Sequence, residues 1–197
     1  MNMAIDEILG KIKALEQDLE IEFEAQRTQF HYRLERRKVL FEQSVQQSHR
    51  DLRKGVLKFW RESGLLNFIT SPVIYALVVP LILLDLSLSF FQLVCFPIYG
   101  IKRVPRTDFI VIDRHHLAYL NWVEKLNCAF CGYANGVIAY GREIASRTEK
   151  RWCPIKHARR VRGAHQRYLE FDDYGDAEGY RLHMNARAEK DGPSSEA

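Results

Sequence analysis

Four residues in the C-terminal half of the chain have the types and spacing of a metal site: Cys128, Cys131, Cys153 and His157. The pattern is C-x2-C-x21-C-x3-H, in which a thiolate pair and a Cys–His pair could each bind from a tight turn. Four such ligands suit a closed tetrahedral zinc site, and iron is the other candidate metal. Thiol redox chemistry and ordinary burial of the cysteines are the alternatives. The sequence therefore predicts a metal site and leaves two other interpretations open.

Three further residues could extend this cluster into an open catalytic site. His115 and His116 lie in the run D-R-H-H, and Glu143 falls within a predicted helix. Imidazole and carboxylate groups are ligands that iron sites use. Adjacent histidines on a helix point about 100° apart, so only one of them is expected to join the site. In the simpler interpretation Asp113 caps a helix and both histidines face the polar membrane surface.

Two predicted helices position these residues. Asp113 is expected to begin a helix that ends at Leu126, after a short extended segment over residues 106–112. A second helix is predicted from about Ala134 to Lys150, where apolar residues recur with helical spacing. This second helix fits inside the spacer of the cysteine pattern.

The same region resembles a group of uncharacterised small bacterial membrane-associated proteins. The shared core has the form C-x2-C-x-Y-A-N-G followed by W-C-P-I-K-H-A-R-R, and the likeness covers Leu126 to Arg160. The resemblance implies a bacterial setting and one coherent module that contains the cysteine and histidine residues. It implies no activity, cofactor or catalytic residue.

The longest apolar stretch, residues 65–100, contains Asp85 as its only formal charge. A membrane helix needs about 20 apolar residues, so the stretch is long for one span and short for two. Lys and Arg residues flank both ends, which favours a cytoplasmic location for both ends and both termini. The sequence therefore predicts a membrane helical hairpin that turns near Pro80 and Asp85. The hairpin could be shallow and re-entrant or could have two full spans, and a single kinked span over 73–95 is the alternative. One such block excludes a channel or carrier that acts alone.

Asp85 and a set of basic residues are the candidate polar groups of the membrane region. Asp85 is interpreted as a wet turn residue rather than a functional group. Anionic headgroups are the nearest partner for basic residues of a membrane-tethered chain, so lipid contact is favoured and no nucleic-acid partner is expected. The residues expected to contact headgroups are Lys102, Arg103, Arg106, Lys156, Arg159 and Arg160.

The sequence predicts one long amphipathic helix over residues 1–63. Two rows of apolar residues recur every eleven positions, one from Ile8 to Leu52 and the other from Ile12 to Val56. An eleven-residue repeat corresponds to about 3.67 residues per turn, which is close to an undistorted α-helix. Residues 8–56 are therefore expected to pair with another helix, from a second copy, a different protein or the C-terminal helices. A helix that lies on the membrane is the alternative.

Together these patterns predict a mostly α protein with four regions. They are a long hendecad helix (1–63), a membrane-embedded segment (64–100), a small α-helical Cys/His module (101–183) and a disordered tail (184–197). The predicted function is a membrane-anchored scaffold with a structural metal site at the cytoplasmic face of a bacterial inner membrane. The alternative is a membrane-associated metal- or dithiol-dependent enzyme that acts on a lipid-soluble substrate.

Overall fold

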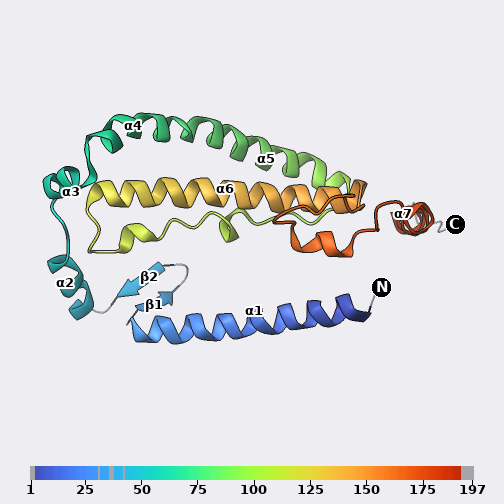
Figure 1. Ribbon diagram of the computed structural model, residues 1–197, viewed down its shortest axis with the longest axis horizontal. Coiled ribbons are helices and arrows are strands. Elements are labelled where there is room, and N and C mark those ends of the chain that lie inside the picture. Colours follow the sequence, from blue (N-terminus) through green and yellow to red (C-terminus); the bar gives the residue numbers. More distant parts are fainter. Residues whose placement is uncertain (1–2, 31, 36–37, 42, 192–197) are drawn as a thin grey trace. The chain divides into compact units, whose positions relative to one another are not determined.

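The computed structural model describes residues 3–30, 32–35, 38–41 and 43–191, and it is mostly helical, as predicted (Figure 1). The chain divides into two compact units. Unit 1 comprises Met1–Ser71 and Ile112–Phe130, and unit 2 comprises Pro72–Val111 and Cys131–Ala197. Each unit is described separately.

Unit 1 begins with a helix and a β-hairpin. Helix α1 covers Met3–Gln29, strand β1 covers Tyr32–Glu35 and strand β2 covers Lys38–Phe41. The two strands are antiparallel, with Tyr32 opposite Phe41. Two short helices follow, α2 (Gln43–Asp51) and α3 (Val56–Ser63).

The predicted single helix over residues 1–63 is wrong beyond Gln29. Phe30 and Leu34 fit the eleven-residue repeat, but together with Tyr32 they also alternate with polar residues as a strand does. Aromatic and branched apolar residues favour strands, and β2 supplies the backbone partners that a strand requires. The strand period therefore prevails here, and within the described residues the predicted helical stripe continues unbroken only along α1.

Helix α6, Trp122–Trp152, begins at a capping box that was not predicted. The Asn121 side chain accepts hydrogen bonds from the backbone N–H groups of Val123 and Glu124, each at 3.0 Å. The Glu124 carboxylate in turn accepts the Asn121 N–H at 2.8 Å. The run N-W-V-E carries this signal. The cap predicted at Asp113 instead precedes a short 3-10 turn, η2 (Arg114–His116), without a side-chain cap.

Unit 2 is built on α5 (Val78–Ile98) and the part of α6 from Cys131 onward, which lie side by side and run in the same direction (Figure 1). Its core consists of Phe96, Val104, Tyr140 and Ile144. The remaining elements are the end of α4 (Leu65–Ala76), α5 (Val78–Ile98), η1 (Arg106–Asp108), η3 (Gln166–Glu170) and α7 (Ala177–Asp191). Since α7 reaches Asp191, the predicted tail is wrong for residues 184–191, and residues 192–197 lie outside the described residues.

The apolar stretch forms no hairpin turn at Pro80 and Asp85, which corrects that prediction. Pro80 lies in the first turn of α5, where its missing N–H removes no helical hydrogen bond, and the helix continues through Asp85 to Ile98. The interruption comes earlier, at Leu77 between α4 and α5. Among the described residues one segment, Ile69–Ile98, is long and apolar enough to cross a membrane.

The chain reverses direction directly after α5. Gly100 adopts a positive φ of 67°, and its N–H donates to the carbonyl of Pro97 at 3.4 Å. The Ile101 N–H donates to the Phe96 carbonyl at 2.8 Å. These two bonds form a Schellman cap, which ends the helix and sends the chain back along it. We call residues 101–111 the return segment.

Candidate membrane-anchoring site

Helix α5 buries its two most polar side chains and exposes most of its apolar ones. Asp85 and Gln92 are only 6% and 8% exposed, whereas Leu86 and Phe90 are 63% and 67% exposed. Ser87 is the one polar side chain among the exposed residues of α5. Water-soluble proteins show the opposite distribution, so this surface is suited to an apolar environment. We call the exposed apolar residues the outer face of α5; they include Val79, Leu83, Leu86, Phe90, Val94 and Ile98.

Asp85 is a buried ion-pair partner and not the wet turn residue that was expected. The Arg106 guanidinium donates to both of its carboxylate oxygens, with Nε at 2.9 Å from Oδ1 and Nη2 at 2.6 Å from Oδ2. The Tyr133 hydroxyl donates to Oδ2 at 3.0 Å. Burial and the bond to Asp85 raise the pKa of Tyr133, which keeps this hydroxyl a donor. Arg106 therefore binds α5 through Asp85, while its side chain remains 46% exposed.

Gln92, about two turns further along α5, joins the helix to the return segment. Its Oε1 accepts the Val104 N–H at 2.9 Å, and its Nε2 donates to the Val104 carbonyl at 3.3 Å. The same Nε2 donates to the Tyr140 hydroxyl of α6, which also lies 3.4 Å from the Ser89 hydroxyl. A buried amide that finds all its partners fixes the register of three segments. We call Asp85, Ser89 and Gln92, with their partners, the polar seam.

A proline explains the position of Arg103. Pro97 has no N–H, so the Leu93 carbonyl four residues earlier in α5 lacks its helical donor. The Arg103 side chain supplies one, with Nη2 at 3.2 Å from the Leu93 oxygen. Arg103, which was expected at lipid headgroups, thus completes the hydrogen bonding of α5.

The four predicted metal ligands are not brought together. Cys131 lies within α6 and Cys153 directly follows it, because α6 runs unbroken through the predicted turn. They are separated by 22 residues, or about 33 Å along a helix, so one ion cannot bind both. No group of three or more His, Cys, Asp or Glu residues able to hold a metal ion occurs in the part of the chain that the structure describes. The predicted Cys/His module is therefore replaced by a continuous helix.

The remaining candidate ligands have other surroundings. Cys128 is half-buried. His115 and His116 are exposed in η2 of unit 1, with ring centroids 3.9 Å apart. His157 belongs to unit 2, where its Nδ1 lies 3.2 Å from the Tyr168 hydroxyl, with the two rings stacked.

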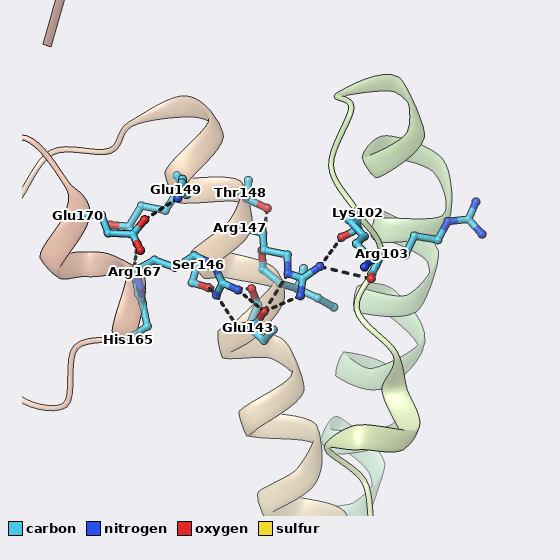
Figure 2. Close-up of polar contacts among 12 residues, drawn as sticks. Lys102, Arg103, Glu143, Ser146, Arg147, Thr148, Glu149, His165, Arg167 and Glu170 are labelled. Atoms are coloured by element: carbon cyan, nitrogen blue, oxygen red, sulfur yellow. Dashed lines mark hydrogen bonds and ion pairs between the residues drawn. The ribbon is translucent and has the colours of Figure 1, made fainter. Parts of the chain in front are cut away.

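Glu143 is held by two guanidinium groups (Figure 2). Arg167 binds it through two bonds of 2.6 and 2.7 Å, and Arg147 donates from Nε at 2.8 Å. Arg147 also reaches the Lys102 carbonyl at 2.6 Å, which ties α6 to the return segment. Burial raises the pKa of Glu143, but the bonds from Arg167 and Arg147 outweigh this and bring the pKa below its usual value. Ion pairs therefore organise the part of unit 2 in which a metal was predicted.

Replacing Glu143 with glutamine should destabilise unit 2 most at neutral pH. Because the folded-state pKa of Glu143 is depressed, its stabilising contribution is full above the unfolded pKa of about 4.5 and is lost as the pH falls through the folded pKa. Urea unfolding of both proteins between pH 7 and pH 3 should show a stability difference that shrinks below about pH 4.5. Glu170→Gln, which removes an exposed pair with Lys150, is the control and should change little. A difference independent of pH would contradict the assignment.

Replacing Cys131 and Cys153 with serine should leave the fold of unit 2 intact. Both cysteines are exposed and too far apart to share an ion, so each change should cost less than about 0.5 kcal/mol. Urea unfolding and zinc analysis of the purified variant would test this. If the variant were less stable and had also lost one bound zinc per chain, the prediction would be wrong and these cysteines would be metal ligands.

Of the other predicted headgroup contacts, Lys156 is paired with Asp173 at 2.8 Å. Arg159 and Arg160 lie in an exposed loop after α6, and Lys102 is exposed in the return segment. These three side chains can reach a charged surface outside the protein.

Comparisons with protein-family models, with characterised proteins and with solved structures give no match to this chain. No relative therefore suggests an activity. The geometry of α5 and its polar seam is the strongest indication of function in the described part of the chain.

Proposed function

We propose that this protein is a membrane-anchored scaffold on the cytoplasmic face of a bacterial inner membrane. The observation that carries the proposal is the reversed distribution of α5, in which Asp85 and Gln92 are buried and the outer face is apolar. At about 25 cal/mol per Å², transfer of such a face from water to lipid provides a large driving force for membrane association. The basic residues Lys102, Arg159 and Arg160 add attraction to anionic headgroups of about 1 kcal/mol each.

The C-terminal ends of α5 and α6 carry side chains that favour a membrane interface. Tyr99 and Trp152 meet edge to face with ring centroids 5.2 Å apart. The Arg151 guanidinium lies 5.1 Å from the centroid of a Trp152 ring. Trp and Tyr are enriched where the hydrocarbon meets the headgroups, because one part of each ring is apolar and another part is polar. This group supports the proposal that the C-terminal end of α5 lies at the membrane interface.

Flotation with vesicles of mixed zwitterionic and anionic lipids tests the anchor. The purified full chain should float with the vesicles, and the double variant Leu86→Asp, Phe90→Asp should remain at the bottom of the gradient. The matched control carries two aspartates at exposed apolar residues away from α5, Val161→Asp and Leu182→Asp, and should float. Equal flotation of the two double variants would contradict the proposal.

The scaffolding part of the proposal rests on α1. Its apolar residues are exposed, Leu15 at 66% and Leu19 at 53%. The helix carries seven acidic and three basic residues, so a second copy alongside would be repelled. We therefore assign this stripe to a basic amphipathic helix of another protein rather than to a homo-oligomer.

Replacing Leu15 and Leu19 with aspartate should abolish binding of a synthetic basic amphipathic helix to the full chain. The two apolar side chains would no longer be buried on binding, and each contributes about 1.5 to 3 kcal/mol. Titration calorimetry with a Leu/Lys helical peptide measures the loss, and Glu16→Gln, on the same helix, is the control. The alternative is that a second copy of the chain covers the apolar stripe of α1. Light scattering of the unchanged protein tests it, because a stable dimer would assign the stripe to a second copy.

A further inference from the structure

The return segment places polar residues beside the middle of α5. Arg106 binds Asp85, which is 13 residues before the end of the helix at Ile98, or about 20 Å back along its axis. Val104 is paired with Gln92 on the way. Together with the bond from Arg103 to the Leu93 carbonyl, these contacts define the path of the segment by hydrogen bonds at three positions along α5.

The return segment is neither helical nor apolar at this position. After the three-residue turn η1, residues 109–111 have no regular structure. Thr107 and Asp108 are exposed, and the Arg106 side chain is 46% exposed. If α5 crossed the bilayer upright, these groups would lie at the depth of the hydrocarbon core. Non-helical backbone and charged side chains are not accommodated there in contact with lipid.

Close packing keeps the return segment in this place. A methyl group added at Gly136 of α6 would lie 2.8 Å from the Phe109 carbonyl oxygen, and one added at Gly132 would lie 3.2 Å from the Val111 oxygen. At Gly136 a Cβ would clash with backbone atoms, so glycine is what lets the two backbones approach so closely there, and the contact at Gly132 is tight. The return segment is therefore part of the folded unit.

We infer that α5 lies in the plane of the membrane, embedded in one leaflet, and does not cross it. Its outer face contacts the acyl chains, and the return segment and the adjoining part of α6 lie on the aqueous side. In this orientation the polar residues Arg106 and Asp108 reach water or headgroups while the outer face stays in lipid. Both ends of the chain then remain on one side of the membrane without a hairpin. This inference rests on the proposed membrane anchoring and specifies its geometry.

Spin labels along the outer face of α5 test the orientation. Single cysteines at Val79→Cys, Leu83→Cys, Phe90→Cys and Val94→Cys, in the full chain with its four native cysteines changed to serine, are labelled and reconstituted into vesicles. These positions span 15 residues, or about 22 Å of helix. Depth measured from the relative accessibility to oxygen and to a water-soluble nickel complex should be the same for all four within about 5 Å, roughly the radius of a helix. A Thr107→Cys label should be accessible to the nickel complex.

The possible results separate the orientation from the anchor. Depths that change steadily by about 20 Å from position 79 to position 94 would show a spanning helix, which overturns the in-plane orientation and retains the membrane anchor. Labels that are all accessible to the nickel complex would overturn both. Labels shielded from both reagents, with spin–spin broadening between chains, would show that a second copy covers α5 and would also overturn the inference. A urea unfolding curve of each labelled protein identifies any variant that has lost its fold. In that case the label is moved to a neighbouring position on the outer face of α5.

Discussion

Arg106→Leu should be among the most destabilising single substitutions in unit 2, with an expected loss of about 3 kcal/mol. The Asp85 side chain is only 9% exposed, and without Arg106 its carboxylate keeps only the neutral hydroxyl donors Tyr133 and Ser89. Asp85→Asn should cost less, about 1 kcal/mol, because Arg106 is 46% exposed and can turn to water. Urea unfolding of the full chain in mild detergent measures both losses.

Two variants make this prediction specific. Arg103→Leu removes a neighbouring arginine that donates one bond to the Leu93 carbonyl, so it should cost about 1 kcal/mol. The double variant Asp85→Leu, Arg106→Leu should recover much of the loss, because it leaves no unpaired buried charge. If Arg106→Leu and Arg103→Leu cost the same, the ion pair with Asp85 has no special role.

Gly136→Ala should destabilise unit 2 by about 2 kcal/mol, although alanine is the better helix former. The added Cβ would lie 2.8 Å from the Phe109 carbonyl oxygen and 2.9 Å from the Ile110 Cα, and both are backbone atoms. The clash can therefore be relieved only if the return segment moves away from α6. Thermal unfolding in detergent should show the lower midpoint.

The other helical glycines provide a graded control. A Cβ at Gly141 would meet only the end of the flexible Leu88 side chain, at 2.9 Å, so Gly141→Ala should cost less. Gly10 in α1 has nothing within 4 Å, and Gly10→Ala should be neutral or stabilise by up to about 1 kcal/mol. Equal effects at the three positions would mean that close packing of the return segment does not limit Gly136.

Some helices could be predicted from the local spacing of residue types, because local interactions determine where those helices form. Apolar residues with helical spacing predicted helix over α1 and over the second half of α6, and the long run with Asp85 as its only charge predicted an apolar segment where α5 lies, although not the continuity of α5 through Asp85. The run N-W-V-E could also have revealed the start of α6, since a capping box involves only adjacent residues. Where two periods overlapped, as at Phe30 and Leu34, the outcome depended on pairing with β2.

The candidate metal site shows why spacing alone was insufficient. C-x2-C and C-x3-H patterns bind one ion only if a turn brings the pairs together, and the intervening residues here continue a helix. The interactions that hold unit 2 together join residues far apart in the sequence, such as Asp85 with Arg106 and Glu143 with Arg167. The spacing of residues in the sequence does not predict such pairs, because each pair depends on how separate segments pack.

The sequence by itself determined the helical character of the chain and the presence of one strongly apolar segment, since both follow from composition and local spacing. Only the tertiary structure decided which side of that segment is apolar. It buries Asp85 and Gln92 against Arg106 and Val104, because a buried charge or amide is stable only with partners, and those partners come from a segment that turns back at Gly100. The same partners, held beside the middle of α5, make the in-plane orientation the one that keeps polar groups out of lipid.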